Sequence, residues 1–176
     1  MIAGDRRAGS GPAAPLAVGD QAPEFALPAA PGDVVDVGAR FGERPVVLLF
    51  FPLAFSSVCT AELCAVRDDW GAWEALEADV YGISADSPFV TRRFREDLRL
   101  PFPLLSDFNH EVASTYGVLY EDYFGLRGVS RRAAFVIGMD GRIGWAWVGE
   151  RDDVLPDFGA VREALARARG YIPPSS

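Results

Sequence analysis

The chain has 176 residues, enough for one domain with a substantial buried core. Its composition, 49% hydrophobic and 24% charged, is ordinary for a folded globule and excludes disorder for most of the sequence. A formal net charge of -8, from 25 acidic and 17 basic residues, argues against nucleic acid or an anionic membrane as a partner.

The two ends differ in character from the rest of the chain. Residues 1–17 hold glycine, proline and alanine without a periodic apolar pattern, so we expect a flexible leader there. Arg6-Arg7 is typical of twin-arginine export signals, but no sustained apolar segment follows, which predicts a cytoplasmic protein. The domain is expected over 18–170, with a tail over 171–176.

The first half of the chain begins with short strands. Residues 25–27 and 34–37 are strand candidates separated by proline and glycine, which predicts a hairpin-like opening. The run 46–51 is apolar on both faces, as in a central strand. From Cys59 the pattern becomes helical, with Gly71 as a candidate kink. Its apolar stripe recurs every three or four residues: Leu63, Val66, Trp70, Trp73 and Leu76.

Strands and helices alternate further along the chain, and a hairpin comes late. Strands are predicted at 80–84 and 102–105, helices at 88–99, 110–116 and 156–169, and a hairpin at 133–139 and 143–148. Asp140-Gly141 is the turn signal of that hairpin. Ser87-Pro88 predicts the cap of the helix at 88–99, with proline at the first helical position. This order predicts an α/β fold in which a mixed central sheet is flanked by helices on both faces.

Two cysteines carry the chemistry that the sequence offers. Cys59 follows a strand and a polar turn and lies where a helix begins, so unpaired N–H groups and the helix dipole favour its thiolate, the nucleophilic form. Cys64 lies five residues later, and the pair is a redox or catalytic candidate. His110 is the only histidine and we do not assign it as a general base. No zinc site and no bound cofactor are expected, because the ligand count is low and no phosphate-binding glycine motif is present.

The residues around Cys59 resemble the peroxiredoxin active-site motif. Residues 52–59 read PLAFSSVC, with proline first, a hydroxyl at Ser56 and the thiol last. Glu62, the stretch FPLLSD at 102–107 and the stretch RAAFVI at 132–137 follow in the order that the family shows. The resemblance runs from about residue 18 to residue 148. It implies a thioredoxin-like fold and the reduction of hydrogen peroxide or organic hydroperoxides.

The same resemblance implies roles for individual side chains. Ser56 would hold the peroxide and the thiolate through its hydroxyl, and Pro52 would shield the thiolate from water. Arg132 would donate hydrogen bonds from its guanidinium; the family spacing selects it over Arg131. Glu62 either orients that arginine or, as a first-turn acid, complements the helix dipole.

The fate of the oxidised Cys59 divides the resemblance between two subfamilies. The spacing to Cys64 resembles the bacterioferritin-comigratory, or Q-type, peroxiredoxins, in which the second cysteine resolves the sulfenic acid as a disulfide, typically reduced by thioredoxin. The flanking residues are closer to the AhpE type, which generally uses one cysteine and an external thiol. Cys64 would then be a small buried residue, and the reductant a low-molecular-weight thiol or a glutaredoxin-like protein.

Two other function classes compete with a peroxidase. A thioredoxin-like disulfide oxidoreductase needs two residues between its cysteines, whereas four separate Cys59 from Cys64. A redox sensor would use the same thiol without catalytic turnover. The family habit also implies a homodimer formed through loops around the active site.

Overall fold

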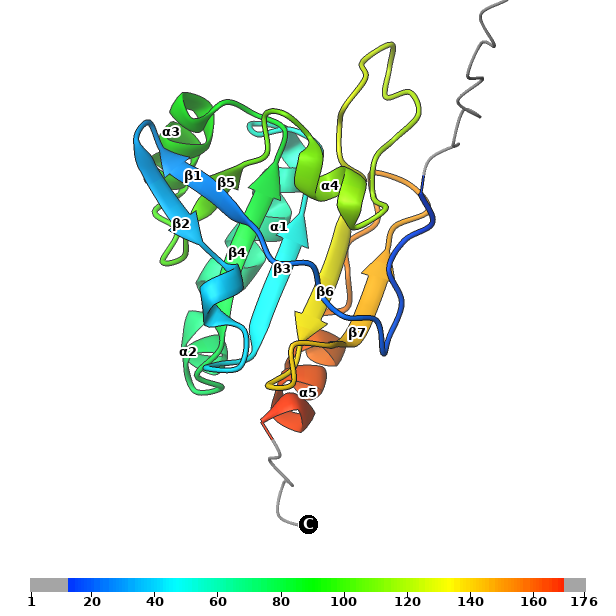
Figure 1. The fold of residues 1–176 in the computed structure, drawn as a ribbon. Helices are drawn as coiled ribbons and strands as arrows, with labels where there is room; N and C mark the ends of the chain where they lie inside the picture. Colours follow the sequence, from blue (N-terminus) through cyan, green and yellow to red (C-terminus); the bar gives the residue numbers. More distant parts are fainter. Residues whose placement is uncertain (1–12, 170–176) are drawn as a thin grey trace, which may run out of the picture.

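The computed structural model describes residues 13–169. At their centre lies a five-stranded sheet in the order β5-β4-β3-β6-β7 (Figure 1). Strand β3 (Val46–Phe50) is central and runs parallel to β4 (Asp79–Ser84), which runs parallel to β5 (Leu104–Ser106). On its other side β3 pairs antiparallel with β6 (Ala133–Ile137), and β6 pairs antiparallel with β7 (Ile143–Val148). The predicted mixed central sheet is confirmed.

Strand β3 is buried along its whole length because the sheet is covered on both faces. Val47 and Leu49 face one hydrophobic cluster, while Leu48 and Phe50 face another. A strand with two buried faces has no polar side to alternate with its apolar one. This explains why the uninterrupted apolar run was a reliable sign of the central strand.

One face of the sheet carries most of the helical layer. Helices α1 (Ser57–Asp68), α2 (Trp70–Glu74), α3 (Pro88–Leu98) and α5 (Phe158–Ala168) all contribute to the cluster that contains Val47. Ser87 caps α3 by accepting the N–H of Val90, with Pro88 at the first helical position, as the sequence predicts.

The opposite face is covered by fewer elements. Helix α4 (Glu111–Thr115) and the hairpin of β1 (Ala26–Ala30) and β2 (Asp33–Asp36) lie in front of the sheet in Figure 1, and a short 3-10 helix, η1 (Gly38–Arg40), follows the hairpin. Helices therefore lie on both faces, as predicted. A long segment between α4 and β6 rises above α4 as an extended loop (Figure 1).

The helix expected from Cys59 to Leu76 is two helices. It begins two residues earlier than predicted, at Ser57, and it breaks at Asp69, whose backbone leaves the helical region (φ -109°, ψ 24°). The predicted kink at Gly71 is therefore wrong. The apolar stripe gave no sign of the break, because α1 and α2 pack against the same cluster.

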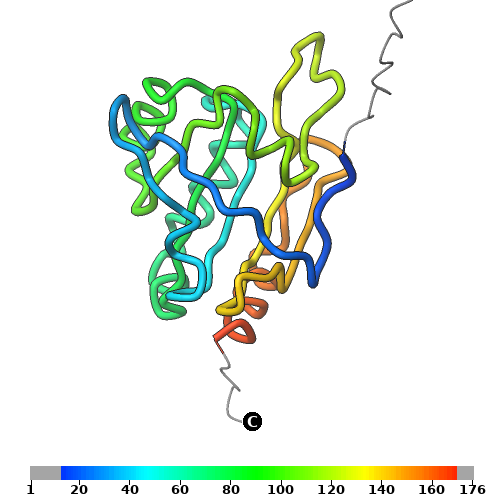
Figure 2. Tube along the Cα trace, in the orientation of Figure 1, coloured from blue at the N-terminus to red at the C-terminus, as the bar shows by residue number. Residues whose placement is uncertain are grey.

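The N-terminal part of the described chain lies along the sheet (Figure 2). The N–H of Leu16 donates to the carbonyl of Tyr116. The N–H of Gly19 donates to the carbonyl of Ile143, where β7 begins, and that of Ala22 to the carbonyl of Gly141 in the turn before β7. Most of the predicted leader and the predicted tail lie outside the described residues. Within residues 13–169, none of the helices combines the length and apolar character needed to cross a membrane.

Candidate active site

The site is built at the first turn of α1, directly after the central strand. Ser56 is the N-cap of the helix, and its Oγ accepts a hydrogen bond from the N–H of Cys59 at 3.4 Å. Cys59 itself is fully buried. Its sulfur therefore lies at the positive end of the helix dipole and away from bulk water.

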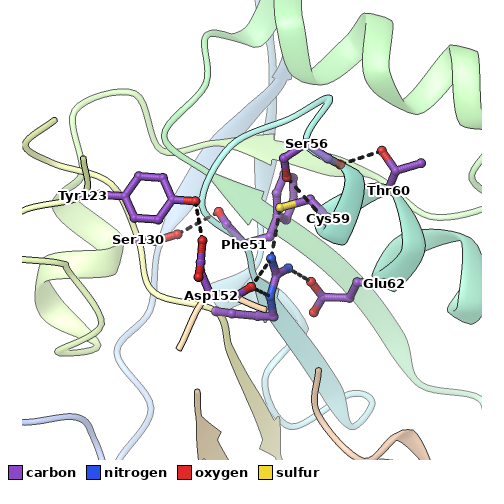
Figure 3. Close-up of polar contacts among 9 residues, drawn as sticks. Phe51, Ser56, Cys59, Thr60, Glu62, Tyr123, Ser130 and Asp152 are labelled. Atoms are coloured by element: carbon purple, nitrogen blue, oxygen red, sulfur yellow. Dashed lines mark hydrogen bonds and ion pairs between the residues drawn. The ribbon is translucent and has the colours of Figure 1, made fainter. Parts of the chain in front are cut away.

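Strand pairing brings Arg132 to the same place. The antiparallel register opposes Phe50, the last residue of β3, to Ala133, the first residue of β6. Arg132 precedes Ala133 and so lies beside the loop that carries the thiol. Its Nη2 donates to Cys59 Sγ at 3.4 Å, across 73 positions in sequence (Figure 3).

A buried ion pair joins Arg132 to the helix that carries the thiol. Glu62 lies one turn after Cys59, and its Oε2 accepts a hydrogen bond from Arg132 Nη1; both side chains are fully buried. Its other oxygen, Oε1, has no hydrogen-bond partner among residues 13–169. Burial raises the pKa of Glu62 to about 7, although the charge of Arg132 acts in the opposite direction.

Arg132 uses every side of its guanidinium. Nε and Nη2 donate to the main-chain oxygen of Asp152 at 3.0 and 2.9 Å, in the loop between β7 and α5. Burial alone would lower the pKa of Arg132, but the negative charges of Glu62 and Cys59 and the bonds to both raise it above its usual value. The arginine thus stays charged beside the sulfur.

The remaining predicted residues take different positions. Pro52 is buried at the start of the loop before α1. Cys64 lies further along α1, half-buried, and both cysteines are free thiols. Arg131 does not approach the sulfur; its Nη2 donates to the carbonyl of Gly149 at 2.7 Å. His110 is the N-cap residue of α4 and makes no side-chain cap hydrogen bond.

Sequence reasoning missed two residues of this network. The carbonyl of Asp152 holds Arg132, and the hydroxyl of Tyr123 donates to Asp152 Oδ2 at 3.1 Å (Figure 3). A main-chain acceptor has no sequence signature, since every residue carries one. Tyr123 belongs to a segment without regular periodicity, so no pattern marks it either.

The arrangement suits two-electron chemistry at sulfur. A buried thiol at a helix N-terminus faces a guanidinium that is fixed from two sides before any substrate arrives, so its N–H groups are aimed at the sulfur and at whatever bonds to it. Fold and site together define a thiol-based redox protein.

Comparisons with known proteins identify the family. The profile of the AhpC/TSA family matches residues 18–146. Peroxiredoxin Bcp of Escherichia coli is 38% identical over 131 residues, covering 73% of this chain and 83% of the relative. A putative peroxiredoxin of Mycobacterium tuberculosis is 39% identical over 131 residues, covering 73% and 82%.

A solved structure agrees with these relatives. The crystal structure of the peroxidoxin BcpB from Mycobacterium tuberculosis superposes with a TM-score of 0.73 at 31% identity, covering 88% of this chain and 97% of that one. The chain therefore belongs to the AhpC/TSA family and is a peroxiredoxin, an oxidoreductase of the thiol peroxidase class with a thioredoxin-like fold.

Proposed function

We propose that Cys59 is the peroxidatic cysteine and reduces hydrogen peroxide and organic hydroperoxides. Its thiolate attacks one peroxide oxygen; the S–O bond forms as the O–O bond breaks, and the second oxygen leaves with a proton as water or an alcohol. The sulfur loses two electrons, which the peroxide gains, and becomes a sulfenic acid. Arg132 stabilises the thiolate and the charge that develops on the departing oxygen.

The observation that carries this proposal is the 3.4 Å contact from Arg132 Nη2 to Cys59 Sγ, made by an arginine that Glu62 also binds. Glu62 acts by orienting the guanidinium. Ser56 is proposed to hold the peroxide through its hydroxyl, and Pro52 to keep water from the sulfur. Both lie in the loop that leads into α1.

We further propose that Cys64 resolves the sulfenic acid. Its thiolate attacks the sulfur of Cys59, an S–S bond forms, and the oxygen leaves as water. In a continuous helix, five positions correspond to a rise of about 7.5 Å, beyond the ~7 Å between Cα atoms that a disulfide spans without backbone movement. Both cysteines lie in the unbroken helix α1, so the first turns must unwind before the bond can close.

Mass spectrometry after one equivalent of hydrogen peroxide, quenched with a thiol-blocking reagent, tests both steps. Loss of two hydrogens mapped to a Cys59–Cys64 link is the expected result, and Cys64→Ser should stop instead at an oxygen on Cys59. Added oxygen on Cys59 with Cys64 free in the wild type would establish a one-cysteine enzyme. If Cys59 did not react, the peroxidase proposal itself would fail.

The reductant follows from the same experiment. A Cys59–Cys64 disulfide is a substrate for thioredoxin, whereas a persistent sulfenic acid requires a low-molecular-weight thiol or a glutaredoxin-like protein. We propose the reducing cytoplasm as its location, because reductants of that compartment can return the oxidised Cys59 to its thiol after each turnover. Continuous peroxide consumption with a thioredoxin and its reductase would exclude a sensor, since a sensor is oxidised only stoichiometrically.

A homodimer is also proposed. Phe89 and Phe108 are 71% and 63% exposed and line one hollow beside the β1–β2 hairpin. Phe55, in the loop next to Cys59, is 55% exposed. Exposed aromatic side chains in such numbers favour an interface with another protein surface. Analytical ultracentrifugation should give a dimer for the wild type and a monomer for Phe89→Glu; a monomeric wild type would refute the proposal.

A further inference from the structure

Asp152 connects two segments that are far apart in sequence. Its main-chain oxygen accepts both Nε and Nη2 of Arg132, while its carboxylate accepts the hydroxyl of Tyr123 at 3.1 Å. Figure 3 shows the phenol of Tyr123 reaching the carboxylate of Asp152. One residue therefore binds the arginine of the site through its backbone and a tyrosine through its side chain.

The geometry of a guanidinium explains why this matters. The group is planar with its N–H bonds in a fixed fork, so two anchoring points determine where the remaining N–H bonds point. Glu62 supplies one anchor at Nη1, and the carbonyl of Asp152 supplies the other at the Nε and Nη2 edge. If the second anchor loosens, Nη2 is no longer aimed at Cys59 Sγ.

The second anchor lies in a loop, and loops need ties to hold a fixed position. The N–H of Gly149 donates to the carbonyl of Arg132 at 2.8 Å, and the carbonyl of Gly149 accepts a hydrogen bond from Arg131 Nη2. Three residues further on, Asp152 accepts a hydrogen bond from the hydroxyl of Tyr123. Tyr123 belongs neither to this loop nor to the start of β6. That hydroxyl is therefore placed to limit movement of the carbonyl that holds the arginine.

Tyr123 is itself held in position. It exchanges two 2.9 Å main-chain hydrogen bonds with Leu126, and its ring stacks on Tyr120 with centroids 5.0 Å apart. Burial and the hydrogen bond to Asp152 raise the pKa of Tyr123 to about 12, so its hydroxyl remains a donor at physiological pH.

We propose that Tyr123 is a positioning residue for peroxide reduction: through Asp152 it fixes the carbonyl that aims Arg132 at Cys59. The inference rests on the proposed peroxidatic role of Cys59. Tyr123 does not act on the peroxide itself. Its hydroxyl sets the direction of the N–H groups that stabilise the departing oxygen.

The test compares the second-order rate of Cys59 oxidation by hydrogen peroxide in variants of the full chain, followed by stopped-flow tryptophan fluorescence. Tyr123→Phe removes only the hydroxyl, and its rate is expected to fall about three- to tenfold, the factor that the loss of one hydrogen bond gives. The oxidation rate of Asp152→Ala should fall by a similar factor, and that of the Tyr123→Phe/Asp152→Ala double variant should fall no further. Asp152→Asn keeps an acceptor oxygen and should retain more activity than Asp152→Ala.

A second reaction separates positioning from general damage to the site. Iodoacetamide alkylates the same thiolate without breaking an O–O bond, so its rate on the high-pH plateau of each variant should stay close to that of the wild type. Asp153→Ala is the matched control, because the carboxylate of Asp153 pairs with the exposed Arg151 and not with the site.

The outcomes are distinct. A Tyr123→Phe rate within twofold of the wild type, additive losses in the double variant, or a parallel fall of oxidation and alkylation would each overturn the inference. A wild-type Cys59 that does not react with peroxide at all would instead overturn the proposed function. A loss confined to peroxide, shared by Tyr123→Phe and Asp152→Ala, would support the positioning role.

Discussion

The side chain of Asp86 holds the main chain of Ala54: the N–H of Ala54 donates a 2.7 Å hydrogen bond to Asp86 Oδ2. Ser84 Oγ donates to the same oxygen at 2.7 Å, and Ser106 Oγ donates to the carbonyl of Asp86 at 2.5 Å. Ser84 and Ser106 end the parallel strands β4 and β5. The loop that delivers Cys59 to α1 is thereby tied to the edge where these strands end.

We expect Asp86→Ala to destabilise the protein and slow the oxidation of Cys59. The substitution leaves the Ala54 N–H and the Ser84 hydroxyl without their acceptor, which costs about 1–3 kcal/mol for a bond to a charged group. Urea unfolding measures the loss of stability, and stopped-flow fluorescence the rate. Asp86→Asn preserves an acceptor oxygen and should lose less of both; equal losses in the two variants would contradict the argument.

The N-cap of α1 gives a second prediction. Ser56→Ala removes the oxygen that accepts the Cys59 N–H, and we expect a loss of about 0.5–1 kcal/mol, at the low end for an N-cap because the bond is 3.4 Å long. Ser56→Thr retains the hydroxyl and should remain close to the wild type in unfolding free energy and in peroxide rate. A threonine variant as impaired as alanine would show that the hydroxyl is not what matters.

Replacing Arg132 with lysine tests the planar fork separately from the charge. One ammonium group does not reproduce the three directions that Arg132 uses toward Glu62, Asp152 and Cys59. The peroxide rate should fall about 10²-fold, as when a preorganised donor is removed from an active site. Arg131→Lys is the matched control and should lose far less, because Arg131 contacts Gly149 and not the sulfur.

The raised pKa of Glu62 predicts how stability depends on pH. The carboxyl holds its proton in the folded protein up to about pH 7, while the unfolded chain releases it near the ordinary value of 4.5. Between these values the folded state binds more protons, so its stability falls as pH rises. Below pH 4.5 this contribution is fully present, and it is lost as pH rises through 7.

Glu62→Gln removes that titration. The difference in unfolding free energy between the wild type and Glu62→Gln should therefore shift in favour of the variant from pH 4.5 to pH 8, by at most about 3 kcal/mol at ~1.4 kcal/mol per pKa unit. Glu74→Gln, which replaces an exposed glutamate at the end of α2, is the control for removing a carboxylate from the surface. A constant difference between wild type and Glu62→Gln across this range would refute the raised pKa.

The parts of the site that sequence predicted are those specified locally. Ser56, Cys59 and Glu62 lie within seven positions of each other, so a helix start and one helical turn bring them together. Arg132 was found through the family motif, because its position depends on the register of β6 against β3. Tyr123 and Asp152 depend on how two irregular segments pack, and neither periodicity nor motif carries that information.

The fold followed a similar division. Central strand, late hairpin and the Ser87-Pro88 cap were predicted, because hydrophobic pattern and turn chemistry determine them. The break between α1 and α2 at Asp69 was not predicted. Both halves of the interrupted helix place apolar residues on the same layer, so Val66 and Trp73 look like one continuous stripe.

The continuity of α1 across Cys59 and Cys64 has a consequence for the lifetime of the oxidised enzyme. In the proposed cycle the sulfenic acid persists until the first turns of the helix open, and during that time a second peroxide can convert it to sulfinic acid. Substitutions that stabilise this helix end would therefore make the enzyme easier to inactivate at high peroxide. Selection on this helix would favour moderate stability over maximal stability.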